Sequence, residues 1–593
     1  MSDIPELTKW QVLFRNYEGT VWTSEKATFR TTKVIGSPIE RPDIEILKAI
    51  SEEIKIEKNK EQRHYSQKHK GLAKTPDDKK KIEFNVEKDE EIDKQLREML
   101  DEQPQTITKT ESDSESHLPY IRIDPSQILL HEINDNSRIE AGIFPLSFRC
   151  YRCGHYQITD PRNPNLTCPC CKVGYCSECG KSVEHTEGKC KDCGSQIKRS
   201  EMTQFSFVFA CPRCANMEEL TPRVEKLRNV QGSTIPCQDT NKDCSGHMHF
   251  WMHGSFQASY WKCEKCDFKM KVDKYCKCHI RGDPDAGIET RPSIMRPIVT
   301  SAPSLTSPLI KSYLYMGNSD VSLASLQKAH VESKDTDPNY WNMIDDMTEL
   351  DVNVVKEKYG ITNAFTVPEI TTLTIVYGYK SGISSHPHTI PEDQRLAQLF
   401  RSGDKYHAYA VKTVGKGLVI VLDKKKIIEV LQKNNLTKYD NYEELVQHTR
   451  NHMATSNFQS LIENVQNLPL VGLMHSLEHA FFKGLTDITG LENFGSKIML
   501  DDCCIVVFER EDLGIGGITQ ITKGKQGTEF KRLLRYAEKQ LRICPQFCNG
   551  GCIACVFIND FNCQPYLPNE VQRWLPPNSL LSRGLSNQFF NIL

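Results

Sequence analysis

The sequence predicts an α+β protein of several domains, and three observations lead to this prediction. The chain has 593 residues, more than a single hydrophobic core usually holds. Seventeen of its 24 cysteines lie between Cys150 and Cys278, so this part of the chain is expected to form small separate units. Strand-like and helix-like hydrophobic patterns alternate through the remainder, which predicts a mixed α/β middle domain and a C-terminal α/β domain.

The first 117 residues are expected to contribute little to a hydrophobic core. Residues 1–54 form a small N-terminal element with an aromatic and β-branched stretch and a helix near residues 44–54. Charged side chains dominate residues 55–117, which we interpret as a linker. A solvated helix and a disordered segment are both open interpretations of this linker.

Residues 118–282 contain the Cys-x-x-Cys pairs. Two residues between two thiolates form a turn that brings both sulfur atoms to one tetrahedral Zn²⁺, and a second pair ten to twenty residues further on completes the site. Cys170 is an alternative to Cys171, and His279 is an alternative to Cys278. We therefore expect tandem zinc ribbons with four ligand sets: Cys150, Cys153, Cys168 and Cys171; Cys176, Cys179, Cys190 and Cys193; Cys211, Cys214, Cys237 and Cys244; and Cys263, Cys266, Cys276 and Cys278.

Paired cysteines could instead form disulfide bonds, which persist in oxidising compartments. The N-terminal sequence MSDIPELTKW lacks a basic segment followed by an apolar one, so no export signal is expected. No apolar run is long enough to predict a membrane-spanning helix. We therefore expect a cytoplasmic protein with reduced cysteines and no membrane partner.

The charge of the whole chain does not favour nucleic acid or membrane as a partner, because 75 Lys and Arg residues balance 77 Asp and Glu residues. The cysteine-rich module has an apparent excess of positive charge. Each site of four thiolates and one Zn²⁺ has a formal charge of about −2, which cancels that excess. Five lysines are therefore expected to offset thiolate charge rather than to contact phosphate: Lys262, Lys265, Lys269, Lys271 and Lys274.

Proline, serine and glycine are frequent between residues 281 and 312, so we expect a connector there with little regular structure. The mixed α/β domain is expected to span residues 283–465. Its elements are strand-like runs at 373–379, 406–414 and 417–422, followed by a helix at 423–431.

The C-terminal domain, residues 466–593, has the clearest local patterns. Its expected elements are a helix at 469–485, a strand at 503–509, a glycine turn at 514–517 and an amphipathic helix at 528–543. The last helix has a basic face that could follow a phosphate backbone, although a solvated helix face predicts the same spacing. The nucleic-acid candidates on this face are Lys531, Arg535, Lys539 and Arg542.

His475, Glu478 and His479 match the pattern H-x-x-E-H, in which two histidines bind zinc and the glutamate acts as a general base. The pattern specifies no third ligand, and a buried polar cluster explains it equally well. Residues 174–182 (GYCSECGKS) differ from a nucleotide-binding loop by one residue in the glycine spacing. We therefore assign no catalytic residue and expect neither an ATPase nor a nuclease; a zinc-dependent protease and a purely architectural zinc scaffold remain alternatives.

The order of these C-terminal motifs, HSLEHAF, CCIVVFE, GIGG, the basic helix and a final cysteine cluster, resembles a known domain. It is similar to the zinc-binding domain of mitomycin-repair (MrfA-like) helicases, which also occurs in DrmB-like proteins of DISARM-type anti-phage defence. The resemblance covers about residues 468–565, and the layout of the preceding chain is similar to DrmB-like proteins without a helicase motor.

This resemblance implies an accessory subunit that binds DNA and pairs with a separate superfamily 2 helicase in a prokaryotic defence system. It implies that the HSLEH segment is a structural helix. By position it implies a fifth zinc site, so that the chain would bind about five Zn²⁺ ions. The chain departs from the family here, where the first two cysteines usually lie closer together. Five cysteines compete for four ligand positions, so Cys544 is an alternative to Cys548. The implied ligands of this site are Cys548, Cys552, Cys555 and Cys563.

Overall fold

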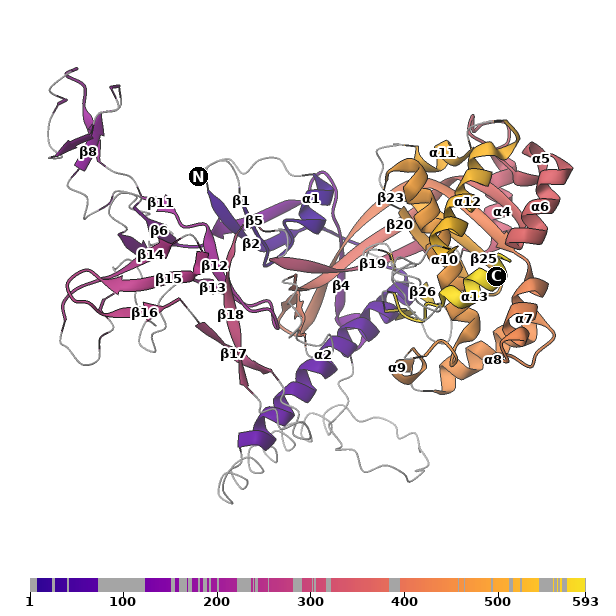
Figure 1. The fold of residues 1–593 in the computed structure, drawn as a ribbon, viewed down its shortest axis with the longest axis horizontal. Helices are drawn as coiled ribbons and strands as arrows, with labels where there is room; N and C mark the ends of the chain where they lie inside the picture. Colours follow the sequence, from indigo (N-terminus) through magenta and orange to yellow (C-terminus); the bar gives the residue numbers. More distant parts are fainter. Residues whose placement is uncertain are drawn as a thin grey trace.

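The computed structural model describes most of the chain between residues 8 and 591 and confirms an α+β architecture with several sheets. Figure 1 shows small sheets at one end of the molecule and a helical lobe at the other, joined by long strands. Short gaps occur throughout, and the largest parts outside the description are residues 73–122, 159–167, 221–235, 281–290, 383–394 and 543–557.

The N-terminal segment forms a helix, three strands and the long helix α2. Apolar residues at helical spacing, Ile46, Ile50 and Ile54, give α2 a buried stripe that packs against the central sheet. Buried ion pairs fix this docking, such as Lys311 with Glu53 at 3.2 Å. The helix extends well into the expected charged linker. The elements are α1 (Lys9–Phe14), β1 (Val21–Thr23), β2 (Thr28–Ile35), β3 (Ser37–Pro38) and α2 (Ile44–Leu72).

The cysteine-rich module consists of short antiparallel strands in small sheets with the orders β11-β6-β7, β10-β8-β9, β13-β12-β18-β17 and β14-β15-β16. Sheets this small bury little surface, so they need cross-links such as metal sites to stay folded. Within and just before the module the elements are η1 (Pro125–Gln127), β4 (Ile128–Glu132), β5 (Arg138–Ile143), β6 (Ser147–Arg149), β7 (Tyr156–Ile158), β8 (Val173–Cys176), β9 (Ser182–Glu184), β10 (Ile197–Arg199), β11 (Thr203–Gln204), β12 (Phe207–Ala210), β13 (Met217–Glu219), β14 (Met248–His253), β15 (Ser255–Cys263), β16 (Lys269–Lys271) and β17 (Lys274–Ile280).

The expectation of a connector with little regular structure at residues 281–312 is wrong for residues 291–299 and 306–312, which form strands, while residues 281–290 lie outside the described residues. Strand β18 (Arg291–Val299) lies between β12 and β17, and β19 (Thr306–Tyr315) forms an edge of the central sheet. Prolines suggested a loop, but Pro308 lies on an edge strand, where a missing backbone N–H costs little. Pro292 and Pro297 lie within β18, opposite His279 of β17 and Phe209 of β12.

The central sheet is built on β20 (Ile361–Ser381) and β23 (Lys405–Leu422), which pair antiparallel along most of their length. β25 pairs with β23 through residues 417–421, and β4 pairs with it in parallel through residues 406–410. The two strand runs expected in 406–422 are therefore one continuous strand. The remaining strands of this nine-stranded sheet are β3, which pairs with β4, and β21 (Gln398–Leu399), β22 (Arg401–Ser402), β24 (Phe494–Met499) and β25 (Cys504–Glu509).

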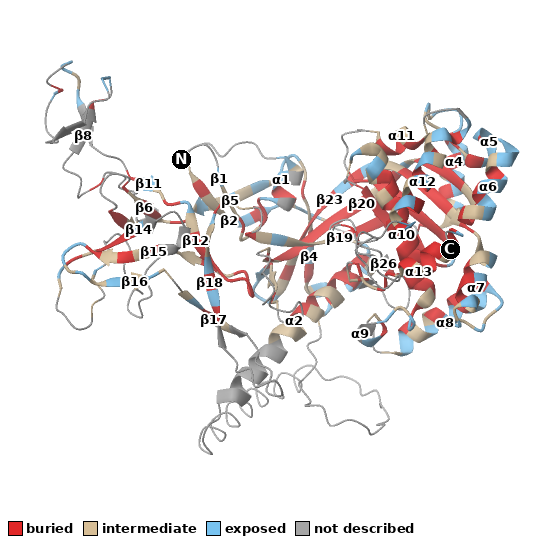
Figure 2. Ribbon diagram, in the orientation of Figure 1, coloured by how far each residue is buried: buried red, intermediate tan, exposed pale blue. Residues whose placement is uncertain are grey.

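The helical lobe surrounds one end of this sheet with a single hydrophobic core that extends from Trp341 to Phe590. Figure 2 shows α10 as a largely buried element of this lobe. The expected division at residue 465 falls inside this core, and β24 and β25 from beyond it complete the sheet. The elements are α4 (Leu323–Glu332), α5 (Met343–Asp346), α6 (Glu349–Tyr359), α7 (Lys424–Lys433), α8 (Tyr442–Thr455), α9 (Phe458–Leu461), α10 (Pro469–Thr489), α11 (Gly517–Thr522), η4 (Lys525–Gly527), α12 (Thr528–Arg542), β26 (Tyr566–Leu567), β27 (Arg573–Trp574) and α13 (Arg583–Phe589).

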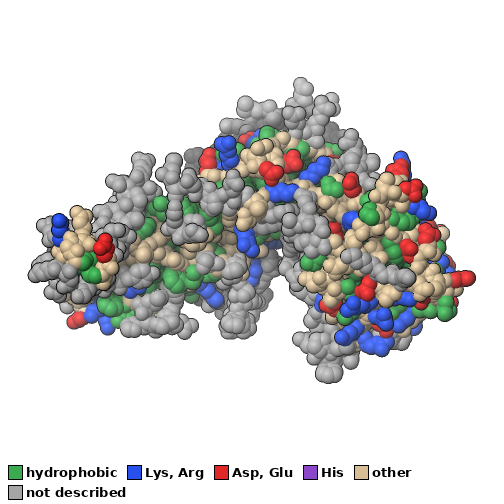
Figure 3. Space-filling model, turned by 90° about the horizontal axis from the view of Figure 1, so that it is seen from above, with side chains coloured by type: hydrophobic (Ala, Val, Ile, Leu, Met, Phe, Trp, Pro, Cys, Tyr) green, Lys and Arg blue, Asp and Glu red, His purple; other side chains and the backbone are tan. Residues whose placement is uncertain are grey.

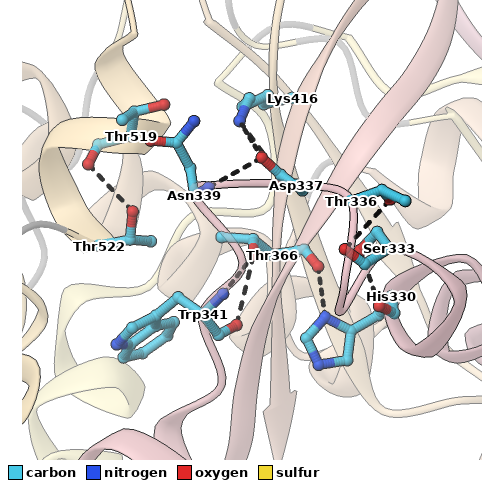
Figure 4. A network of polar contacts seen from close by, with 10 residues as sticks. All are labelled: His330, Ser333, Thr336, Asp337, Asn339, Trp341, Thr366, Lys416, Thr519 and Thr522. Atoms are coloured by element: carbon cyan, nitrogen blue, oxygen red, sulfur yellow. Dashed lines mark hydrogen bonds and ion pairs between the residues drawn. The ribbon is translucent and has the colours of Figure 1, made fainter.

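A polar network joins the segment between α4 and α5 to the two central strands (Figure 4). Lys416 of β23 contacts Asp337 at 3.0 Å. The hydroxyl of Thr366 in β20 accepts a hydrogen bond from the backbone N–H of Trp341 at 3.0 Å, and the carbonyl of Thr366 accepts one from His330 at 2.8 Å. These bonds satisfy buried polar groups and fix α4 against the sheet.

Close packing around β23 gives a direct test of this arrangement. A Cβ atom at Gly415 would overlap the backbone carbonyl of Glu509, which cannot move without disturbing β25. We expect Gly415→Ala to destabilise the protein by about 1–3 kcal/mol, the usual cost of overpacking. The measurement is chemical denaturation of the metal-loaded protein. Gly142→Ala is the control, because a Cβ at Gly142 meets no atom within 4 Å. Equal stability of the two variants would contradict the packing of β23 described above.

Candidate metal centres

Four Cys-x-x-Cys pairs share one backbone geometry. The N–H of the first cysteine donates a hydrogen bond to the carbonyl five residues later, with N···O distances between 2.7 and 3.0 Å. In the three pairs whose second cysteine is described, this bond closes a tight turn that brings the two sulfur atoms to one side. The bonds join Cys150 to His155, Cys190 to Ser195, Cys211 to Asn216 and Cys263 to Phe268.

Cys176, Cys179, Cys190 and Cys193 come together as the sequence predicts. The Sγ atoms of Cys176 and Cys193 are 3.2 Å apart, and those of Cys179 and Cys190 are 3.6 Å apart. Thiolates held at about 2.3 Å from one tetrahedral ion lie about 3.8 Å from each other, so the spacing suits a metal. A backbone hydrogen bond from Ser195 lowers the pKa of Cys193 to about 6, which favours the thiolate form that binds metal.

The next eight cysteines form two sites whose membership differs from the prediction. Sulfur contacts of 3.4 to 3.8 Å join Cys211 to Cys278, Cys214 to Cys276, Cys237 to Cys266 and Cys244 to Cys263. The expected sets, which combined 211 and 214 with 237 and 244, and 263 and 266 with 276 and 278, are therefore wrong. The structure defines an outer site, Cys211, Cys214, Cys276 and Cys278, and an inner site, Cys237, Cys244, Cys263 and Cys266.

Strand pairing explains the exchange of partners. β18 pairs with both β12 and β17, so the end of β12 at residue 210 lies in the same sheet as residues 276–278. The hairpin β14–β15 brings the segment before residue 248 next to the turn after Cys263. The sequence prediction combined cysteine pairs that are close along the chain. The sheets instead bring together cysteine pairs that are further apart along the chain.

Buried Arg213 lies within the first turn of the outer site. Burial lowers the pKa of its guanidinium, while the four neighbouring cysteines oppose that shift. A cation held against four thiolates offsets the formal charge of about −2 of a metal-loaded site. The outer site therefore has its own counter-ion inside the protein.

The first expected set is described only in part. Cys150 and Cys168 are buried in one small cluster with Phe148 and Met202. Cys153, Cys170 and Cys171 lie outside the described residues, and so do the ring atoms of His279. The turn at Cys150 has the same backbone hydrogen bond as the other three pairs, which is consistent with a metal site there.

Metal content of paired variants tests the grouping of the inner and outer sites. Cys237→Ser with Cys266→Ser should lose one ion, because both residues belong to the inner site. Cys214→Ser with Cys237→Ser should lose two ions, although it removes the same number of thiolates. Elemental analysis of the purified proteins measures both. The reverse result would restore the grouping that the sequence suggested.

A fourth cluster lies in the helical lobe and contains two histidines of the HSLEH segment. His475 and His479 lie one turn apart on α10, and their Nε2 atoms are 3.2 and 3.1 Å from Sγ of Cys563. All three side chains are buried. Nitrogen and sulfur ligands of one tetrahedral ion lie about 3.5 Å apart, so the three atoms suit a metal centre with two histidines and one cysteine.

Neighbouring backbone groups hold these ligands in position. Nδ1 of His475 is 2.8 Å from the carbonyl of Ser579, which can only accept, so Nδ1 carries the proton and Nε2 presents its lone pair to the cluster. The backbone N–H of Asn578 donates to Sγ of Cys563 at 3.0 Å. Burial lowers the pKa of His475 to about 4, which keeps the imidazole neutral. A neutral imidazole is the form that binds metal.

Glu478 and Arg510 are two further buried ionisable groups beside this cluster. Oε2 of Glu478 is 3.9 Å from Nε2 of His475. Burial raises the pKa of Glu478 to about 8, and Ser496 and Arg510 partly oppose this shift. Burial lowers the pKa of Arg510 to about 9, opposed by Cys563 and Glu478. Arg510 therefore offers a buried positive charge to the cysteine, as Arg213 does in the outer site.

The sequence did not assign His475 and His479 as metal ligands, although their spacing on one helix face was a visible signal. The resemblance to MrfA-like proteins implied Cys548, Cys552 and Cys555 as the partners of Cys563, and these three cysteines lie outside the described residues together with Cys544. Among the described residues, the possible metal ligands grouped with Cys563 are the two histidines. The structure thus links α10 directly to the end of the chain.

We expect His479→Ala and Cys563→Ser each to lose one bound metal ion, and the double variant to lose no more than either single variant. Each substitution removes a ligand of the same ion, so the losses do not add. Metal analysis and thermal unfolding measure the effect. Cys504→Ala, which removes a buried cysteine from outside these clusters, is the control and should keep every ion. Two separate losses in the double variant would show that these residues do not share a site.

The basic residues of α12 are placed unequally. Its apolar residues pack into the core and its basic face points outward. Lys531 contacts Asp351 at 2.9 Å, and Arg542 contacts Glu538 at 2.7 Å. Arg535 and Lys539 are exposed. Figure 3 shows Lys and Arg side chains gathered along one edge of this lobe.

The chain matches no protein-family model, and no curated protein matches it either. Within the described residues, no helix combines the length and apolar character needed to cross a membrane.

Proposed function

We propose that this chain is a zinc-stabilised accessory subunit, without a motor of its own, that binds DNA beside a separate superfamily 2 helicase in the cytoplasm. Its role would be in a prokaryotic anti-phage defence system of the DISARM type. The donor sets support Zn²⁺ as the ion, because four thiolates, or two imidazoles and a thiolate, are ligands that zinc prefers. About five ions would be bound if the partly described first site also forms.

The described segments that carry the resemblance to MrfA-like and DrmB-like proteins support this proposal by packing together. Helix α10 packs against α11, α12 and α13. A Cβ at Gly484 would lie 2.8 Å from the carbonyl of Leu533, so this glycine lets α10 and α12 approach closely. Cys563 joins the same unit through the two histidines. Motifs that are separate in sequence thus form one structural element.

DNA is proposed to bind at the outward face of α12. Arg535 and Lys539 lie one turn apart, are exposed, and form no ion pair with any described residue. Cations without a protein counter-ion are available to phosphates, and two of them along a helix can follow a nucleic-acid backbone. Lys531 and Arg542 flank this pair but are already bound to carboxylates.

The protease alternative is less well supported by the geometry. A peptidase needs a metal position that the substrate can reach, with a glutamate beside it. His475, Glu478 and His479 are all buried, and the third ligand atom in the cluster is Sγ of Cys563. This environment favours a structural centre that holds α10 to the end of the chain. Glu478→Gln should accordingly leave every activity of the chain unchanged.

Charge reversal on α12 tests the proposal. We expect the double variant Arg535→Glu and Lys539→Glu to bind duplex DNA more weakly, with a salt dependence reduced by about 0.9 in log–log slope for each phosphate contact removed. Fluorescence anisotropy at several salt concentrations measures both quantities. Lys425→Glu on α7 is the matched control, because Lys425 is 86% exposed and lies on a different helix.

The helicase partnership is tested separately by purifying the tagged chain from its own cells. An ATPase with superfamily 2 motifs should accompany it and hydrolyse ATP faster when DNA is added. Unchanged DNA binding in the α12 double variant would overturn the assigned surface. The absence of any such ATPase would overturn the partnership.

A further inference from the structure

One face of the sheet β14-β15-β16 is buried, and the other is exposed at Trp251, Lys269 and Lys271, whereas His249 on that second face is buried beside His155. Alternate residues of a strand point to opposite sides, so Phe250, Trp261 and Cys263 face the module core. The strand pairing places the opposite residues in two rows across the sheet. The first row contains Trp251, Tyr260 and Lys271, and the second contains His249, Lys262 and Lys269.

Trp251 is the unusual member of these rows. Its side chain is 44% exposed, although tryptophan usually buries its large apolar surface. Tyr260 lies directly opposite on β15 and is half-buried, with the ammonium group of Lys269 at 5.2 Å from its ring centroid. An exposed indole beside a phenol and several lysines is a combination that binds bases and phosphates together.

The lysines of this face are not explained by thiolate charge. Lys262 follows Trp261 on β15 and points away from Cys263, so it faces away from the inner metal site. Lys269 and Lys271 point to the same side as Lys262 and Tyr260. Lys262, Lys269 and Lys271 form no ion pair with any described residue. Our expectation that these three side chains serve only to offset thiolates therefore does not fit their direction.

Two acidic residues lie near this face and do not cancel its charge. Glu264 is held by His247 and His249, with N···O distances of 2.9 and 3.0 Å. Asp267 lies in the turn between β15 and β16. Lys265 in the same turn is exposed and adds a fourth lysine at the rim. Among the described residues this face therefore carries more lysines than acidic side chains, while a metal-loaded inner site beside Cys263 adds a formal charge of about −2.

We propose that the exposed face of β14-β15-β16 binds single-stranded nucleic acid. Bases would stack on Trp251 and Tyr260, and phosphates would contact Lys262, Lys269 and Lys271. The rows lie about 7 Å apart, two residues along each strand, so bases and phosphates of one strand can occupy neighbouring rows. A duplex does not offer free base faces to an indole, which makes the single strand the fitting ligand. This inference rests on the proposed nucleic-acid-binding function. It adds to the duplex-binding surface on α12 a second surface that binds a single strand.

The test compares a labelled oligodeoxythymidine with a labelled DNA duplex, using the full chain loaded with metal. Trp251→Leu keeps an apolar side chain but removes the aromatic face, and we expect about tenfold weaker binding of the single strand. Trp251→Phe should bind nearly as well as the wild type. Duplex binding should be the same in all three proteins. Unchanged metal content shows that the variants are folded.

Lysine variants measure the phosphate contacts independently. Lys269→Gln with Lys271→Gln should lower the salt dependence of single-strand binding by about 0.7 in log–log slope for each contact removed. Lys328→Gln on α4, where the side chain is 76% exposed, is the matched control and should change nothing. An oligouridine probe shows whether RNA is bound as well as DNA, since bases and phosphates are common to both.

The outcomes separate the two proposals. Single-strand binding that is unaffected by Trp251→Leu and by the lysine variants would overturn the assignment of this face. Duplex binding that still depends on Arg535 and Lys539 would in that case leave the proposed function standing. A chain that binds neither probe would overturn both.

Discussion

The pairing of β20 with β23 is the contact on which the rest of the structure depends. One half of β23 pairs with β4 and the other half pairs with β25, so strands from the N-terminal, middle and C-terminal segments meet on one backbone. Both faces of the pair are buried, and its side chains enter four separate hydrophobic clusters. Gly415 and Gly417 permit the close approach of neighbouring groups where the strand passes from one half to the other. The expected domain boundaries do not interrupt the central sheet. The hydrogen bonds of a sheet join strands regardless of how far apart they lie along the chain.

Features that depend on neighbouring residues could be predicted from the sequence. Helix α12 has the expected apolar spacing and boundaries, and α7 begins after Asp423, whose side chain caps the helix. The turns of the Cys-x-x-Cys pairs are equally local. Which cysteine pairs share one metal site does not depend on neighbouring residues. The turns are alike, so the pairing of strands in the sheets decides which pairs come together. Strand β18 was missed for a related reason: its prolines resemble those of a loop, and its neighbours β12 and β17 are far away in sequence.

The metal clusters fall into two groups with different consequences for function. The clusters of the cysteine-rich module lie among small sheets that share a core of buried aromatic residues such as Phe209, Phe250 and Trp261, and one of these sheets presents aromatic and basic side chains to solvent. The cluster of His475, His479 and Cys563 lies inside a large core that already packs well, and it adds a link between α10 and the end of the chain. Buried arginines accompany both kinds of cluster, since thiolate charge inside a protein requires a nearby cation. The two surfaces proposed to bind nucleic acid thus differ in what holds them in place. The face of β14-β15-β16 lies on a small sheet beside a metal cluster, and α12 packs on the large core of the helical lobe.

The inner site is nested within the loop that the outer site closes. Cys237 to Cys266 lies wholly between Cys214 and Cys276, so the inner ion closes a shorter stretch of chain than the outer ion does. The entropy lost in closing a loop rises with its length, and a loop already tied in its middle has less entropy left to lose. Closing the inner loop therefore costs less entropy than closing the outer loop, and an ion bound at the inner site would lower the cost of closing the outer one.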